Sequence, residues 1–105
     1  MAAFDIHANP EPRTRGALPY VIELQADLLS DLNTRLVAPF VPAQHYRGAV
    51  PRLNPVIDIE GEPHVLLVQQ MAALPKRTLA APALANAEAH RYDIIAAVDF
   101  LVTGI

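Results

Sequence analysis

Apolar and polar residues alternate with a period of two in several short stretches of the chain. The clearest is residues 20–26, which predict a strand with side chains pointing alternately inward and outward. The inward set is Tyr20, Ile22, Leu24 and Ala26, and the outward set is Glu23 and Gln25. Residues 3–7 and 34–40 predict further strands. Pro39 favours a sheet edge for the second of these, because proline cannot donate a ladder hydrogen bond.

The middle of the chain predicts a hairpin. Two β-rich runs, residues 56–59 and 64–69, flank a short turn that contains Gly61, and the unbroken apolar run 65–68 favours a strand buried on both faces. Residues 71–79 predict one more short strand, and residues 41–54 a long irregular connection. The pattern therefore predicts five to seven short antiparallel strands forming a small curled sheet or barrel.

The last twenty residues, 86–105, follow a helical period instead. Asn86 is the predicted N-cap and Gly104 suits the residue that ends a helix. One apolar stripe, expected to dock on the core, consists of Ile94, Ile95, Val98, Leu101, Val102 and Ile105. The opposite face is less usual, since it carries Ala96, Ala97, Phe100, Thr103 and Gly104. That face is either buried within the fold or a surface for a partner.

A further feature of the helix favours the partner surface. Asp99 lies in the last turns of the predicted helix, where a negative charge opposes the helix dipole, so local stability does not explain it.

Leu28 and Leu29 lie side by side in a polar connection, residues 27–33. The pair is either a plug that folds back on the sheet or an exposed contact pair.

Composition indicates one domain, residues 1–105, that meets another protein. Hydrophobic residues make up 52% and charged residues 18%, so some apolar surface is expected to contact another chain, and a homodimer is a reasonable expectation. The net charge of −3 argues against direct nucleic-acid binding. The N-terminus shows no signal peptide and no run is long enough to span a membrane, so we expect a cytoplasmic protein.

Catalytic, metal-binding and cofactor-binding motifs are not found. The chain has no cysteine, and its four histidines lack the spacing of a metal site. Asp58 and Glu60 could form a carboxylate pair, but carboxylates two residues apart beside a turn are typical of a solvated hairpin face. A binding protein is therefore favoured over an enzyme, with the C-terminal helix as its binding surface.

Several segments together resemble the CcdB family, plasmid and chromosomal toxins that poison DNA gyrase. They are residues 19–40, Pro55-Val-Ile-Asp-Ile59, the Met71-to-Pro75 turn, and the terminal helix from Arg91 to Gly104-Ile105. The resemblance implies a mainly β fold, a small antiparallel SH3-like barrel with one C-terminal helix, acting as a homodimer. It also implies binding to the gyrase A subunit, trapping of the cleaved DNA complex and neutralisation by a CcdA-like antitoxin.

The resemblance assigns the gyrase-binding residues as well. The three terminal residues that are essential for poisoning correspond to Thr103, Gly104 and Ile105, where the best-known plasmid member has tryptophan in place of the threonine. Loss of that aromatic is expected to cost about 2 kcal/mol at an interface hot spot unless another group, such as Phe100, compensates. The remaining positions are Asp99, Leu28, Leu29 and Phe4.

Two alternatives remain open from the sequence. A messenger-RNA endonuclease toxin of the related barrel fold should present basic groove residues beside an acid/base pair, and the −3 charge with its scattered arginines argues against it. A non-toxic relative that binds only the antitoxin or gyrase is the other alternative, and Thr103 is the residue that favours it.

Overall fold

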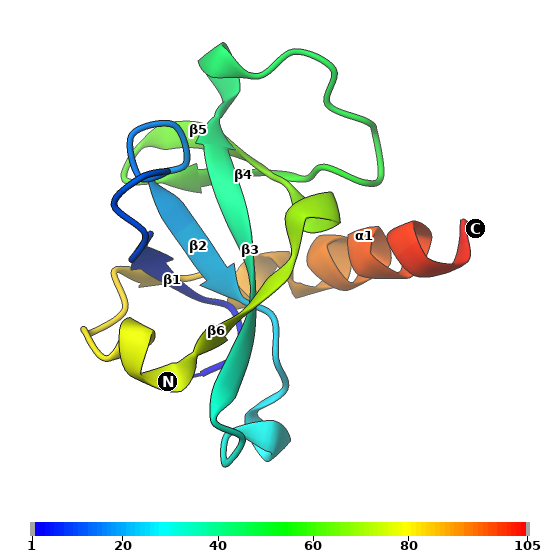
Figure 1. Ribbon diagram of the computed structural model, residues 1–105. Helices are drawn as coiled ribbons and strands as arrows, with labels where there is room; N and C mark the ends of the chain where they lie inside the picture. The colour runs from blue at the N-terminus through cyan, green and yellow to red at the C-terminus, as the bar shows by residue number, and fades with distance from the viewer. Residues whose placement is uncertain (1, 105) are drawn as a thin grey trace.

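A computed structural model describes residues 2–104 and shows a curled, nearly closed antiparallel barrel with one C-terminal helix (Figure 1). The strands are β1 (Asp5–Ala8), β2 (Tyr20–Glu23), β3 (Thr34–Pro42), β4 (Val56–Ile59), β5 (Glu62–Leu66), β6 (Ala72–Pro75) and β7 (Ala85–Asn86). The helix is α1 (Arg91–Thr103), and the short 3-10 helices are η1 (Asp27–Leu29), η2 (Ala43–His45), η3 (Val68–Gln70), η4 (Lys76–Leu79) and η5 (Glu88–His90). The sheet order is β4-β5-β3-β2-β1-β7, with β6 paired to β3. The predicted fold class is confirmed.

Strand β3 is central, so the predicted edge position of Pro39 is wrong. On one side β3 pairs with β2 over residues 37–40, and on the other it pairs with β6 up to Val37 and with β5 from Phe40 onward. The Pro39 carbonyl accepts from the Leu67 amide at 2.9 Å on that second side. In an antiparallel strand, the amide and the carbonyl of one residue point toward the same neighbouring strand. The side on which Pro39 lacks an amide hydrogen therefore faces the gap between β6 and β5.

The hairpin β4–β5 forms as predicted. Glu60 and Gly61 join the strands with φ values of 53° and 84°, the positive angles that a two-residue hairpin turn requires. The continuous apolar run is buried on both faces, from Val65 to Val68. Residues 43–55 form the long connection between β3 and β4, with η2 as its regular part.

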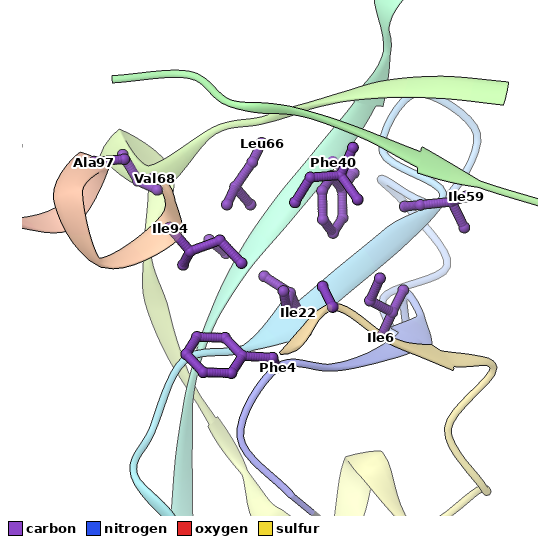
Figure 2. Packing of buried hydrophobic residues seen from close by; sticks show 12 residues of the cluster. Phe4, Ile6, Ile22, Phe40, Ile59, Leu66, Val68, Ile94 and Ala97 are labelled. Carbon is purple, nitrogen blue, oxygen red and sulfur yellow. The ribbon is translucent and has the colours of Figure 1, made fainter. Parts of the chain in front are cut away.

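The main core lies between the concave sheet and the first half of α1 (Figure 2). Its side chains are Phe4, Ile6, Ile22, Ala38, Phe40, Ile57, Ile59, Leu66, Val68, Ala87, Ile94 and Ala97. Removing this much apolar surface from water is the main favourable contribution to folding of a chain that has no disulfides.

The helix docks by a narrower face than the sequence predicts. Ile94 and Ala97 are buried and Val98 packs beside them, whereas Ile95 is 41% and Val102 74% exposed. Leu101 also belongs among the exposed residues, and Ile105 lies outside the described residues. The reason is geometric: α1 meets the barrel beside Val68 and then extends past it, so its C-terminal turns lack a sheet to cover them (Figure 1; Figure 2).

Helix α1 starts later than predicted, at Arg91, and ends before Gly104 as predicted. Asn86 belongs to β7, and its Oδ1 accepts from the Glu88 amide at 2.8 Å in a local turn, whereas the N-cap residue of α1 is His90. Gly104 takes the left-handed conformation, φ 72°, and its amide donates to the Phe100 carbonyl at 2.9 Å. Among residues 2–104, the helices are too short or too polar to cross a membrane.

Candidate functional site

The last turn of α1 is a solvent-facing surface. Asp99, Thr103 and Gly104 are exposed, Phe100 is half-buried, and Ile105 lies outside the described residues. The Thr103 hydroxyl donates to the Asp99 carbonyl at 2.7 Å, so its side chain folds back along the helix. The helix end is therefore not sealed inside the subunit, with one correction: Ala97, predicted on the same face, is fully buried.

Phe100 has a specific neighbour that the sequence does not reveal. The Arg52 guanidinium carbon lies 4.5 Å from the centroid of the Phe100 ring, within the range of a cation–π contact. Arg52 belongs to the long connection before β4 and has φ 74°, a conformation that non-glycine residues rarely adopt. One face of the aromatic ring is therefore covered by a cation that is itself solvent-accessible.

A groove of about 310 Å³ runs beside α1 and carries polar groups at its rim. Its apolar lining includes Leu24, Leu36, Met71, Ile94, Ile95 and Val98. Asp99 and Arg91 border it from the helix, and Asp27 borders it from η1. Since Asp27 directly precedes Leu28, the groove reaches the start of the 27–33 segment.

Leu28 and Leu29 are an exposed contact pair. Leu28 is 91% and Leu29 49% exposed, so the interpretation of the pair as a plug on the sheet is wrong. The physical reason is the anchoring of η1, whose Asp27 Oδ1 accepts from the Ala3 amide at 2.6 Å. Leu32, at 51% exposure, is a third exposed leucine of the 27–33 segment, and nothing in its local pattern distinguishes it.

Phe4 is a core residue. Only 4% of it is exposed, the Arg91 guanidinium carbon lies 5.4 Å from its ring centroid, and its φ of 68° turns the side chain inward (Figure 2). Phe4 also lines the groove beside α1, and its predicted role in gyrase binding stays a prediction.

A buried charged network is the largest feature that the sequence prediction missed. Glu23, predicted to point outward, is 2% exposed; its Oε2 accepts from His7 Nε2 at 2.7 Å and its Oε1 lies 3.5 Å from Arg35 Nε. The second face of the sheet is covered as well, by a cluster of Val21, Val37 and Leu79. A covered second face places Glu23 in a desolvated site, where it must be paired.

The same network contains the one group of potential metal ligands found among the described residues. Donor atoms of Asp5, His7 and Glu23 lie within 4.8 Å of one another. Arg35 already places a positive charge beside Glu23, and His7 and Glu23 bond directly to each other. This arrangement fits a buried ion-pair network better than a cation site, because an added cation would face the guanidinium. Within the described residues, His7 Nδ1 is buried and has no hydrogen-bond partner.

A second hollow, of about 240 Å³, lies at the hairpin turn. The Tyr20 hydroxyl donates to Glu60 Oε2 at 3.2 Å, and its ring meets the His64 ring edge-on with centroids 5.2 Å apart. Burial, followed by the negative charge of Glu60 and the hydrogen bond to it, raises the pKa of Tyr20 above its ordinary value of 10.0, and Glu62 adds to the effect. This hollow is separate from the groove beside α1.

Comparison with known proteins identifies one family. The family model described as CcdB protein matches residues 3–104, nearly the whole chain. No curated protein matches the chain.

Proposed function

The chain belongs to the CcdB family, toxins of toxin–antitoxin systems, and we propose that it poisons DNA gyrase. In this proposal the protein binds the gyrase A subunit, traps the cleaved DNA complex and catalyses no reaction itself. A CcdA-like antitoxin neutralises it. Because gyrase acts on bacterial DNA, this function places the protein in the cytoplasm.

The exposed end of α1 is the observation that supports the proposal most. A helix whose C-terminal turns extend past the barrel, with Val102 74% exposed, has apolar surface that the chain itself does not cover. Contiguous apolar surface of this kind marks interaction sites in small proteins. The gyrase-binding residues in this proposal are Asp99, Phe100, Thr103, Gly104 and Ile105, together with Leu28 and Leu29.

The absence of a tryptophan at position 103 predicts a weaker toxin. Replacing a hot-spot aromatic typically costs about 2 kcal/mol, or roughly 30-fold in affinity. Phe100 is the group that can compensate, and the Arg52 contact holds its ring at the helix end. We therefore propose moderate potency.

A homodimer is the second part of the proposal. Two copies of α1 side by side would bring two sets of the C-terminal residues to one face, which suits a target that is itself a dimer. Exposed apolar side chains along the helix and beside the groove, Ile95, Leu101 and Leu36, supply surface for such contacts.

The test is accumulation of cleaved plasmid. Purified protein is incubated with gyrase, ATP and supercoiled plasmid, beside a version that ends at Val102. We expect linear DNA to accumulate with the full-length chain and not with the version that ends at Val102. Binding to the A subunit without cleavage would instead identify a non-toxic relative, and absence of both binding and cleavage would refute the proposed target.

A further inference from the structure

Arg35 is a charged residue in the interior of the protein. It is 3% exposed, and its Nε lies 3.5 Å from Oε1 of Glu23, which is bonded in turn to His7. A guanidinium removed from water must find a compensating charge and acceptors for its N–H groups. Glu23 provides the charge, and the remaining donors point elsewhere.

Those donors bind the backbone of a single segment. Arg35 Nη1 donates to the carbonyls of Leu32 at 2.8 Å and Thr34 at 3.0 Å, and Nη2 donates to the carbonyl of Ser30 at 2.6 Å. The chain between η1 and β3 is thus wrapped around one planar guanidinium. Arginine suits this role because its fork holds several donors in fixed directions.

The segment has little packing of its own. Leu28, Leu29 and Leu32 are 91%, 49% and 51% exposed, so burial of these side chains cannot set its shape. Two further side chains donate to it from outside, Gln25 to the Leu29 carbonyl at 2.8 Å and Lys76 to the Ser30 carbonyl at 3.3 Å. Of the three side chains that donate to the segment, Arg35 is the buried one.

We propose that Arg35, held by Glu23 and His7, is a positioning residue that orders residues 27–33 so that Leu28 and Leu29 meet the gyrase A subunit in a fixed geometry. This inference rests on the proposed function. Its physical content is preorganisation: a segment already held in its bound shape loses less conformational entropy when a partner binds. Arg35 itself touches no partner.

The test compares Arg35→Lys with wild type. Lysine keeps the positive charge beside Glu23 but, with one ammonium, cannot reach three carbonyls in the fork geometry. Arg77→Met, an exposed cation on η4, is the matched control. We expect amide exchange at residues 28–33 to quicken in Arg35→Lys while exchange in β5 stays unchanged, and affinity for the purified gyrase A subunit to fall about tenfold.

A double-mutant cycle separates positioning from general destabilisation. If Arg35 acts through the segment, Arg35→Lys has little further effect on gyrase affinity once Leu28→Ala has removed the contact. Equal effects in both backgrounds, or unchanged affinity in Arg35→Lys while Leu28→Ala weakens binding, would overturn the positioning role. Failure of the wild-type protein to bind the A subunit would instead refute the proposed function, and the inference with it.

Discussion

Gly104 shows how one residue sets the direction in which the chain leaves α1. Its φ of 72° is the left-handed conformation, and among the described residues no atom beyond the adjacent backbone lies within 4 Å of where a Cβ would stand, so Gly104→Ala introduces backbone strain without a clash. We expect a loss of about 1 kcal/mol in the free energy of unfolding, with weaker gyrase binding. Denaturant unfolding measures the first and a binding titration the second.

The matched control for that change is Gly16→Ala. Gly16 has equally open surroundings but no positive φ, so this variant should unfold at the same denaturant concentration as wild type. Equal stability of the two alanine variants would contradict the strain argument.

Tyr20 gives a pH-dependent prediction. Its folded-state pKa is raised, so its stabilising contribution is complete below pH 10 and is lost as the pH rises through the folded-state value. Glu60→Gln removes the nearest negative charge and should lower the pKa of Tyr20. Ultraviolet titration of tyrosinate checks this, with Tyr20→Phe to assign the signal among the three tyrosines. An unchanged titration curve in Glu60→Gln would contradict it.

At the scale of elements, α1 separates residues that hold the fold from residues available to a partner. Ile94 is 1% exposed in the core, so Ile94→Ala should cost about 2–5 kcal/mol of stability. Val102→Ala, at a 74% exposed position, should stay within about 0.5 kcal/mol of wild type while weakening gyrase binding. Thermal unfolding and a binding titration measure both, and equal destabilisation by the two variants would refute this division of the helix.

The elements differ in how far local pattern predicts them. The β4–β5 hairpin follows from its turn residues, and β2 from its alternation, because those signals are local. The burial of Glu23 does not, since it depends on Leu79, which comes from far along the chain to cover the second face of the sheet. The two-residue strand β7 carries no periodicity at all, and its pairing with β1 is a long-range event.

The candidate site divides in the same way. Exposure of Thr103 and Gly104 agrees with the helix pattern, whereas the docked stripe of α1 was placed too broadly because the helix extends past the barrel that would cover it. The resemblance assigns Phe4 to the gyrase-binding residues, and its burial beside Arg91 is visible only in three dimensions. The contact between Arg52 and Phe100 joins residues far apart in the sequence, and no local sequence pattern predicts it.

For the whole molecule, the network of Glu23 connects three strands, with His7 on β1 and Arg35 on β3. Glu23→Leu alone leaves the guanidinium buried without its counter-charge, and we expect a loss of about 3–5 kcal/mol in the free energy of unfolding. Adding Arg35→Met removes the unpaired buried charge. The double variant, Glu23→Leu with Arg35→Met, should therefore recover much of that stability, because apolar replacement of a buried ion pair is often neutral. Chemical denaturation of the two variants beside wild type measures this.

The double variant also separates the fold from the function. It lacks the guanidinium that binds the carbonyls of Ser30, Leu32 and Thr34, so we expect a stable protein with a loosened 27–33 segment and reduced affinity for gyrase A. Stability and affinity that recover together would show that the network serves folding alone. Recovery of stability without recovery of affinity would show that the buried charge shapes the surface presented to the partner.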